Sequence, residues 1–460
     1  MAESMTEGIG VGLGGVGSEG GYAAYGPADP KKRAQHILDV FEGTFGALID
    51  GDPAAFRTKF RKMAASAFAF YRGTACLFYT DLDGREDAFL DERTSRVWIH
   101  GDLHAENFGT YMNADGKLVF NVNDFDEAYV GCYTWDVKRF AASLALIGYG
   151  KALADEAISA LVERYARAYV DQLRLLTRET TPEESALTLT STEGPLLDVL
   201  RQARLQTRIG LLRTQTAVVE HERRFTLSGG AFELADDVKA QVLEAFERYL
   251  DTLPPATRRN PDSYAVKDVV GRRGVGIGSA GLPSYNLLIE GNTEALENDV
   301  LLYMKQGQTP SVSRHVTDPE VRSYFEHEGH RTVISQRALQ AHADPWLGYT
   351  DIDGIGQLVA EVSPYANDLD WSDLNEVETI ADVVDHLGRA TATMHAVADE
   401  ESGHSLVPFS TEHAILDMIE RDSEGFASDL VAFAHAYGAR ARADHAIFVD
   451  LFRNGLIRGL

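Results

Sequence analysis

The chain has 460 residues, of which 44% are hydrophobic and 25% charged, a composition typical of a globular protein with two or three structural units. Its formal net charge at pH 7 is −27. A surface this acidic repels nucleic-acid phosphates and anionic lipid, so neither nucleic acid nor a membrane is expected as a partner.

The first 30 residues are rich in glycine and lack both a basic segment and a solid apolar segment. This composition predicts a disordered tail rather than a signal peptide. No apolar stretch elsewhere is long enough to cross a bilayer. Cys76 and Cys132 are the only cysteines and have no C-x-x-C spacing. They predict two free thiols in a reducing cytoplasm, with a single bridge between them as the alternative.

Apolar residues recur at three- and four-residue spacing over residues 33–80, which predicts helix. Short apolar runs bounded by polar turns predict strands at 97–100 and 117–122. A helix is expected over 135–146. Residues 155–250 are again helical in pattern and end at a proline-rich linker.

The period changes between residues 264 and 364, where strands are predicted at 266–270, 285–289, 300–304 and 357–362, with one helix over 324–342. From residue 373 onward the pattern is helical again. This order predicts an α+β fold. Its expected parts are a tail (1–30), a helical lobe (31–260), a β-rich lobe (261–365) and a helical return (366–460).

The segment VWIHGDLHAENFG (97–109) places two histidines, two carboxylates and an amide behind a short apolar run. Asp102 and Asn107 have the Asp-x-x-x-x-Asn spacing of a kinase catalytic loop. In that loop the aspartate accepts or orients the proton of an attacking hydroxyl, and the asparagine helps to hold Mg²⁺. Asp102 and His100 are therefore the candidate catalytic residues, with His100 expected to brace the loop. His104 is expected to brace the loop as well or to contact the substrate.

The second predicted strand leads into NVNDFDEAYVG (121–131). Asp124 occupies the position of the metal-binding aspartate of a kinase, and its hard oxygen ligands suit Mg²⁺ together with Asn107. Asp126 and Glu127 are candidates for further metal ligation or for supporting the ligands. Solvated surface acids are an equally good interpretation of these two residues.

The β-rich block opens with VVGRRGVGIGSAGLPSYNLLIEG (269–291), in which Gly276, Gly278 and Gly281 satisfy G-x-G-x-x-G. A dinucleotide-binding fold needs a helix at the third glycine, but an apolar strand pattern follows here. The Gly-Lys-Ser/Thr of a Walker loop is also missing. The segment therefore predicts a glycine-rich hairpin whose backbone, including Ser279, covers the phosphates of ATP.

Lys305 ends the next predicted strand, VLLYMKQ (300–306). A lone lysine at the end of an apolar strand usually extends into solvent and only marks where the strand ends. Because Lys305 follows a glycine hairpin by one strand, it also lies where a kinase lysine reaches the α- and β-phosphates. The two features together favour ATP and Mg²⁺ as cofactors.

The main alternative for the first motif is a transition-metal site formed by His100, Asp102 and His104. Residues i, i+2 and i+4 of a strand lie on one face and could ligate zinc. Gly101 weakens strand geometry there, and such a site gives Lys305 and the glycine hairpin no role.

Two motifs, HGDLHAENFG (100–109) and NDFDE (123–127), resemble the aminoglycoside-phosphotransferase and choline-kinase branch of the kinase-like fold. A larger set more closely resembles the bacterial family called domain of unknown function 2252, over roughly residues 60–400. This set adds FAFYRGTA (68–75), YMKQGQTPSV (303–312), QRALQAHADPWLG (336–348) and LGRATATMHA (387–396).

The resemblance implies a protein-kinase-like two-lobe fold with a circular permutation. Lys305 follows Asp102 by about 200 residues, whereas the lysine comes first in kinases. Residues 387–396 resemble the helix that precedes the catalytic loop in phosphotransferases, so placing 265–400 before 97–145 restores the kinase order. The helical lobe would then carry the catalytic and metal-binding loops, and the β-rich lobe would bind the nucleotide.

The resemblance also assigns Asp136 to the support of the catalytic loop, with Arg139 and Gln336 as further supporting residues. The family pattern commonly has a glutamate just before the Gln-Arg pair, but Ile334 and Ser335 stand there in this chain. The acid that pairs with the lysine is therefore unassigned, with three candidates: Glu320, Glu326 and Glu328.

The leading hypothesis is an ATP- and Mg²⁺-dependent phosphotransferase that acts on a hydroxyl or amino group. The acceptor is an unidentified small molecule or protein, expected against the helices of residues 150–250. A nucleotide-binding sensor with little turnover is the second hypothesis. Transfer of AMP instead of phosphate, and a His/Asp metal-dependent hydrolase, complete the alternatives.

Overall fold

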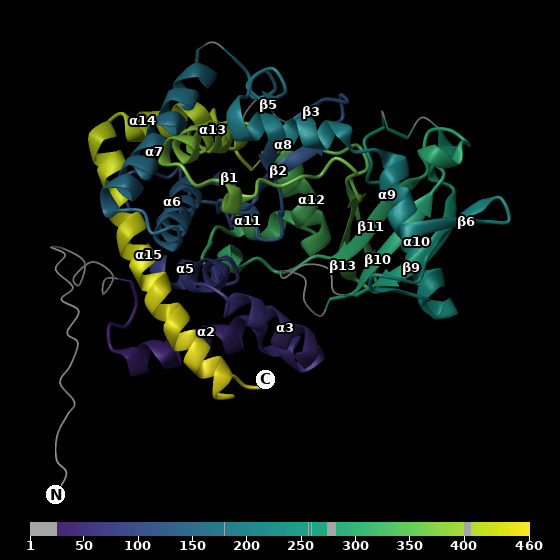
Figure 1. Ribbon diagram of the computed structural model, residues 1–460, viewed down its shortest axis with the longest axis horizontal. Coiled ribbons are helices and arrows are strands. Elements are labelled where there is room, and N and C mark those ends of the chain that lie inside the picture. The colour runs from purple at the N-terminus through teal and green to yellow at the C-terminus, as the bar shows by residue number, and fades with distance from the viewer. Residues whose placement is uncertain (1–24, 179, 256, 259, 274–281, 400–405) are drawn as a thin grey trace, which may run out of the picture.

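The computed structural model describes residues 25–460 apart from 179, 256, 259, 274–281 and 400–405. Most of the predicted tail thus lies outside the described residues. The same holds for the predicted glycine loop, which includes Gly276, Gly278, Ser279 and Gly281. Helices and strands both contribute, which confirms the predicted α+β class. Figure 1 shows most helices gathered on one side of the molecule and the largest sheet on the other.

Ten helices named here make up the helical part. They are α2 (Pro30–Gly51), α3 (Pro53–Met63), α4 (Ala67–Arg72), α5 (Ala75–Leu82), α6 (Tyr133–Gly150), α7 (Asp155–Leu176), α8 (Gly194–Leu205), α13 (Val377–His395), α14 (Thr411–Ile419) and α15 (Ser423–Arg453). Helix α13 packs along α7, and the long helix α15 contacts α6, α7 and α2 in turn (Figure 1). Apolar side chains from α4 to α8, from α13 to α15 and from strands β1 to β4 form the largest core, whereas α2 and α3 pack with α15 in a second core.

The predicted helix over 33–80 is in fact four short helices, because local capping residues interrupt the pattern. Asp52 ends α2 and caps α3 by accepting a hydrogen bond from the Ala55 N–H at 2.9 Å, and Pro53 occupies the first position of α3. Ser66 caps α4 in the same way. These breaks let α3 and α4 turn toward the catalytic-loop motif instead of extending away from it.

Two pairs of short strands hold the two polar motifs face to face. Strand β1 (Val97–Ile99) pairs with β4 (Tyr129–Gly131), and β2 (Phe108–Met112) pairs with β3 (Leu118–Val122), both antiparallel; β5 (Leu187–Thr188) extends the second sheet. The loop 100–107 leaves β1 and enters β2, whereas the loop 123–128 leaves β3 and enters β4. The two loops therefore share both ends and must lie side by side.

The β-rich part is one six-stranded antiparallel sheet in the order β12-β13-β11-β10-β9-β8. Its strands are β8 (Ala231–Phe232), β9 (Val266–Arg272), β10 (Ser284–Ile289), β11 (Val300–Gln306), β12 (Gly348–Ile352) and β13 (Ile355–Glu361). Lys305 lies near the end of β11, opposite Ser284 of β10 and Leu358 of β13.

Helices cover both faces of this sheet. Helix α10 (Asp236–Leu250) contributes Phe246 and Tyr249 to a core with Leu287 and Leu302. Helix α12 (Glu328–Leu339) packs against β12 and β13 on the other side and is preceded by the short α11 (Pro319–Tyr324). The predicted helix over 324–342 therefore corresponds to α12, and α11 ends where that predicted range begins.

Residues 155–250 are less helical than their pattern predicts. Helix α9 (Arg208–Gln215) is followed by a hairpin of β6 (Thr216–Val219) and β7 (Glu222–Phe225), whose two turn residues, Glu220 and His221, have positive φ angles of 51° and 74°. This is the geometry of a tight hairpin turn, but the usual Asn-Gly or Asp-Gly signal is lacking. The β6–β7 hairpin and α10 contact the six-stranded sheet, so this portion of residues 155–250 packs with the β-rich part.

The two ends of the described chain meet. Tyr25 packs its ring edge-on against Phe433 and Tyr437 of α15. Arg33 of α2 is fully buried and forms ion pairs with Asp81 of α5 and Asp444 of α15, each at 2.6 Å. Removing one partner of such a buried pair costs about 3–5 kcal/mol, so this contact fixes the terminal helices to the core.

Cys76 is buried and Cys132 half-buried, and both are free thiols, as predicted. Along the described part of the chain, no helix combines the length and apolar character needed to span a bilayer.

Candidate functional site

The buried carboxylate of Asp136 holds the first residues of the loop 100–107, which follows β1. Asp136, near the start of α6, accepts hydrogen bonds from the backbone N–H groups of His100 (2.6 Å) and Gly101 (2.9 Å). His395 of α13 approaches the same carboxylate with Nε2 at 3.2 Å, and Tyr169 contacts its Nδ1 at 2.9 Å. Because a carboxylate only accepts, Nε2 of His395 carries the proton. Asp136 therefore holds the backbone at the start of this loop.

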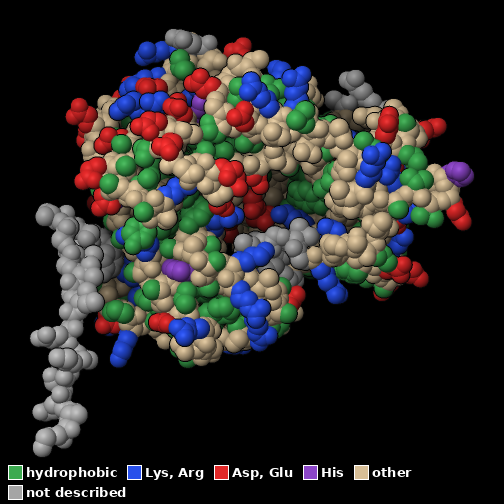
Figure 2. All heavy atoms as spheres, in the orientation of Figure 1, with side chains coloured by type: hydrophobic (Ala, Val, Ile, Leu, Met, Phe, Trp, Pro, Cys, Tyr) green, Lys and Arg blue, Asp and Glu red, His purple; other side chains and the backbone are tan. Residues whose placement is uncertain are grey.

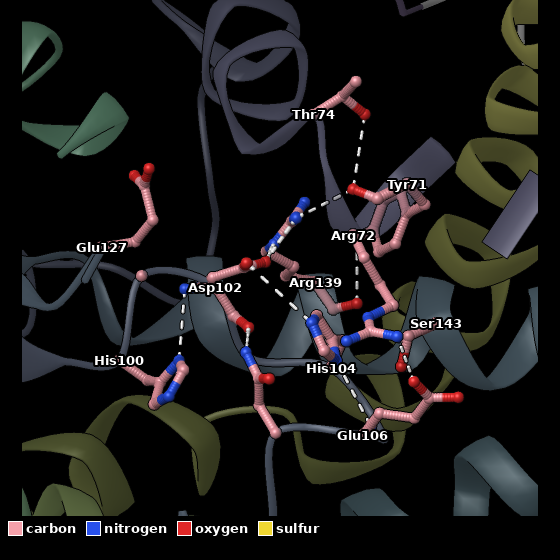
Figure 3. A network of polar contacts seen from close by, with 12 residues as sticks. Tyr71, Arg72, Thr74, His100, Asp102, His104, Glu106, Glu127, Arg139 and Ser143 are labelled. Carbon is pink, nitrogen blue, oxygen red and sulfur yellow. Dashed lines mark hydrogen bonds and ion pairs between the residues drawn. The ribbon is translucent and has the colours of Figure 1, made fainter. Parts of the chain in front are cut away.

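Asp102 is held by a buried arginine. Arg139 of α6 is fully buried and places Nε 2.7 Å from Oδ1 of Asp102, as Figure 3 shows. The guanidinium also lies over the ring of Tyr71, 4.4 Å from its centroid. Burial would lower the pKa of Arg139, but Asp102 and Tyr71 raise it, so the guanidinium is charged. Both arginine contacts go to Oδ1, which leaves Oδ2 of Asp102 toward the cavity.

The two histidines of the motif have different surroundings. His100 is fully buried; its Nε2 donates to the Asn123 carbonyl at 2.7 Å, and its Nδ1 accepts the Asp102 N–H at 3.3 Å. It joins the two loops and does not line the cavity. His104 lines the cavity with Nε2 3.9 Å from Asp102 Oδ2. Burial and then Arg72 and Arg139 hold the pKa of His104 well below its usual value, so it is neutral at pH 7.

Asn107 and Asp124 present oxygen atoms to the same space. The side-chain amide of Asn107 donates to the Asp102 carbonyl at 2.9 Å, which turns its Oδ1 the other way. Asp124 makes no hydrogen bond or ion pair to any described residue, and its φ of 57° is left-handed. That conformation costs roughly 1–3 kcal/mol and persists where surrounding contacts impose it. Asp124 is exposed as a residue, but the protein around its carboxylate desolvates that group. This desolvation and the negative charge of Asp126 raise the pKa of Asp124.

Lys305 reaches the acidic loop from the sheet. Its Nζ lies 2.9 Å from Oδ1 and 3.1 Å from Oδ2 of Asp126. Burial would lower the pKa of Lys305, but Asp126 and then Asp124 raise it, so the ammonium is charged. Residues 124–126 and 305, far apart in the chain, are therefore neighbours. Asp126, suggested as a metal ligand, is engaged by this ammonium.

The candidate partners of Lys305 that the sequence suggested are wrong. Glu320 pairs with Arg96 at 2.6 Å, and Glu328 pairs with Arg331 at 3.0 Å. In the described structure Glu326 makes no hydrogen bond or ion pair with Lys305, whereas Asp126 does. The chain thus supplies the acid from the loop after β3 instead of from a helix of the β-rich part.

Arg331 of α12 is a residue that the sequence gave no reason to select. It is 1% exposed and donates hydrogen bonds to the carbonyls of Phe125, Asp126 and Ala128 and to that of Gln308. One guanidinium thereby fixes the acidic loop to the β-rich part. Its only sequence signal is an arginine four residues before the Ser335-Gln336-Arg337 segment.

Glu127 closes the acidic loop on its other side. Its carboxylate accepts the Ser311 N–H at 2.5 Å, which joins the loop to the segment after β11. Although the residue as a whole is only half-buried, the surroundings of the carboxylate desolvate it. That burial, with the charge of Asp102, raises the pKa of Glu127 to about 7.

Two cavities meet at Asp124 and Asp126. The Asp102 cavity, of about 360 Å³, is lined by Asp102, His104, Asn107 and Glu127 together with residues of α2 to α5. The Lys305 cavity, of about 180 Å³, is lined by Lys305, Tyr303, Gln336 and Glu361. Figure 2 shows the surface hollowed in this region, with acidic side chains gathered inside. No residue of 150–250 is among the described residues that line either cavity, so the wall beside Asp102 is not the expected one.

The zinc-site alternative finds no support in the geometry. Within the described ranges, no group of three or more His, Cys, Asp and Glu side chains could hold a metal ion. Gly101 has a φ of 78°, which ends the strand, and both ring nitrogens of His100 are occupied. His100, Asp102 and His104 therefore do not share a strand face.

Gln336 lines the Lys305 cavity, and its amide donates to Gln340.

A comparison with known protein families matches residues 51–451 to the family described as uncharacterized protein conserved in bacteria (DUF2252). The match covers most of the chain, so the chain belongs to this family. Two further comparisons, one with curated proteins and one with solved structures, found no match. The predicted family is thus confirmed, whereas the relation to aminoglycoside phosphotransferases and choline kinases stays a prediction.

The backbone at Gly101 gives a test of the loop geometry. A Cβ at this position would lie 2.1 Å from the Glu127 carbonyl oxygen, so Gly101→Ala adds a clash to the strain of a positive φ. Gly116→Ala is the matched control, because its φ is 71° and nothing lies within 4 Å. Urea unfolding should give Gly101→Ala an extra loss of about 1–3 kcal/mol relative to Gly116→Ala. Equal losses would show that the two loops are not in contact there.

Glu127 predicts a pH dependence of stability. Its pKa is about 7 in the folded state against 4.5 for an unperturbed glutamate. Between these values the folded state binds more protons than the unfolded state, so stability should fall as pH rises from about 5 to 8. Glu127→Gln keeps an acceptor for Ser311 and should flatten this part of the Tm profile. Glu244→Gln, on the exposed face of α10, should keep the wild-type slope, and an unchanged slope in Glu127→Gln would contradict the assignment.

Proposed function

We propose that this protein is an ATP- and Mg²⁺-dependent phosphotransferase with a circularly permuted kinase-like fold. The observation that carries the proposal is the contact of Lys305 with Asp126, next to Asp124 and the cavity of Asp102 and Asn107. A cation on a strand, an acidic loop and an Asp-x-x-x-x-Asn loop are the parts that phosphoryl transfer needs at one point.

The order of the strands supports the kinase-like part of the proposal. Strands β9 and β10 are antiparallel neighbours, and β11 follows with Lys305 near its end. A kinase carries its lysine on the strand that follows the two strands of the glycine-rich hairpin. Helix α13 leads back from the β-rich part and ends at His395, which contacts Asp136 below the catalytic loop. The permuted order of segments is consistent with this path.

The donor set fits a magnesium ion. Asn107 turns its amide oxygen away from its hydrogen bond to the Asp102 carbonyl, and Asp124 has no partner in the described structure. Mg²⁺ prefers such oxygen ligands and takes few of them from protein, with water and phosphate supplying the others. Asn107 and Asp124 would hold the ion, and Lys305 would contact the phosphates. When bound, ATP supplies the phosphoryl group, and Mg²⁺ neutralises part of its charge.

Asp102 would orient the acceptor. Arg139 binds Oδ1 and stabilises the carboxylate, so Oδ2 is the oxygen that can accept a hydrogen bond from the acceptor hydroxyl or amine. The Arg139 contact and the Asp136 anchor fix the loop before any ligand binds. Pre-orientation of this kind avoids the entropy cost of ordering the loop during the reaction. His100 braces the same loop and touches neither cavity.

The test separates nucleotide binding from turnover. ATP with Mg²⁺ should raise the Tm of the wild type by several degrees, and Lys305→Met should lose this shift while Lys117→Met, at an exposed position, retains it. Asp102→Asn should retain the shift but turn over ATP about 10²–10⁴ times more slowly, because the orienting carboxylate is lost.

The outcomes distinguish the competing functions. Nucleotide binding in the wild type without turnover would favour a sensor. Label transferred from the α-phosphate of ATP, and not from the γ-phosphate, would favour AMP transfer. No response to any nucleotide, or wild-type turnover in Asp102→Asn, would overturn the proposal.

A further inference from the structure

The Asp102 cavity has a cationic wall as well as its acids. Lys59 and Lys62 of α3 and Arg72 of α4 line it together with Asp102 and Glu127. Figure 2 shows Lys and Arg side chains near the edge of the hollow, on the side where Figure 1 draws α3. In a chain with a net charge of −27, three cations on one wall of a small cavity are a local reversal of sign.

Lys59 is the exceptional member of this wall. It is only 7% exposed, yet it has no hydrogen bond or ion pair with any described residue. Its ammonium makes cation–π contacts with two rings, with Phe45 at 4.5 Å and Phe56 at 5.5 Å from Nζ to the centroid. Ring contacts replace only part of the hydration that a buried ammonium loses, and lysines are seldom buried unless an acid pairs with them.

The acids of the cavity do not neutralise Lys59, because most already have partners. Asp102 is held by Arg139, Asp126 by Lys305, and Glu127 by the Ser311 backbone. Burial lowers the pKa of Lys59, and the weaker electrostatic influence of Cys76 and these acids opposes this effect.

Arg72 adds a second cation to the wall. It pairs with Glu106, and both side chains are about one-third exposed, so the pair is partly screened by solvent. Its Nε is buried and makes no hydrogen bond in the described structure. Lys62 is exposed at the rim of the same cavity. The wall therefore offers one deep ammonium, one unused guanidinium N–H and one ammonium at the entrance.

We propose that Lys59, with Arg72 and Lys62, forms a subsite for an anionic group of the acceptor. The acceptor is then a small molecule that carries both a hydroxyl and a phosphate or carboxylate. This inference rests on the proposed function, since it concerns the substrate of the same site. The cavity volume of about 360 Å³ fits a small ligand.

The location assigns this subsite to the acceptor and not to the nucleotide. Lys59 lines the cavity that contains Asp102, whereas Lys305 lines the other one. Asp124 and Asp126 belong to both and separate the two cations. An anion held by Lys59 therefore lies on the Asp102 side, where the acceptor hydroxyl must be oriented.

The test uses glycerol 3-phosphate, inorganic phosphate and glycerol as probes on the full chain, by calorimetric titration at constant ionic strength. Both anions should bind the wild type, and glycerol should not. Lys59→Met keeps the length and apolar stem of the side chain, and its Tm should equal or exceed that of the wild type, because an unpaired buried charge is removed. It should weaken binding of both anions at least about tenfold, while ATP-Mg²⁺ affinity stays within about twofold. Lys117→Met should change neither.

Each outcome has a defined meaning. Loss of anion binding in Lys59→Met but not in Lys305→Met supports the subsite and excludes free phosphate bound at the nucleotide lysine. Equal weakening of ATP-Mg²⁺ and of the anions in Lys59→Met would assign the cation to the nucleotide and overturn the inference, as would wild-type anion affinity in that variant. If anions bind through Lys59 while no nucleotide binds, the subsite stands and the phosphotransferase proposal fails.

Discussion

The ion pair between Lys305 and Asp126 is the contact on which the arrangement of the site depends. It joins the end of β11, an inner strand of the β-rich sheet, to the loop after β3, and Arg331 supports it with hydrogen bonds to the backbone of the same loop. Without these contacts the two cavities would have no common wall. Because both groups are charged and largely desolvated, the pair holds its geometry only while each has the other as partner.

Charge pairing then explains which residues are left for ligands. Asp136 is used by the loop backbone, Asp102 Oδ1 by Arg139, and Asp126 by Lys305. Among the described residues that line the two cavities, the groups left for ligands include four: Oδ2 of Asp102, the oxygen of Asn107, the carboxylate of Asp124 and the ammonium of Lys59. Three are oxygen atoms suited to a hard cation or a proton, and the fourth is a cation suited to an anion. A site with these free groups has the means to bring a metal-bound phosphate and an anionic acceptor together.

The sequence predicted the parts that depend on local spacing. The apolar period predicts the α+β class and the strand that ends in Lys305. The motifs predict that Asp102, Asn107 and Asp124 lie on polar loops that follow short strands. What the sequence could not predict depends on pairing between distant segments. The motif places Asp126 among the candidate metal ligands, and the sequence gives no signal for Lys59, because only packing places α3 beside the catalytic loop. The β6–β7 hairpin was missed because Glu220 and His221 are not typical residues of its turn.

The most direct test of the account is a crystal structure of the protein with a non-hydrolysable ATP analogue and Mn²⁺, whose anomalous signal locates the metal. The account predicts a manganese peak between Asn107 and Asp124, with the analogue's phosphates against the Lys305 ammonium. A metal or nucleotide bound away from these side chains, with Lys305 still paired to Asp126, would contradict it.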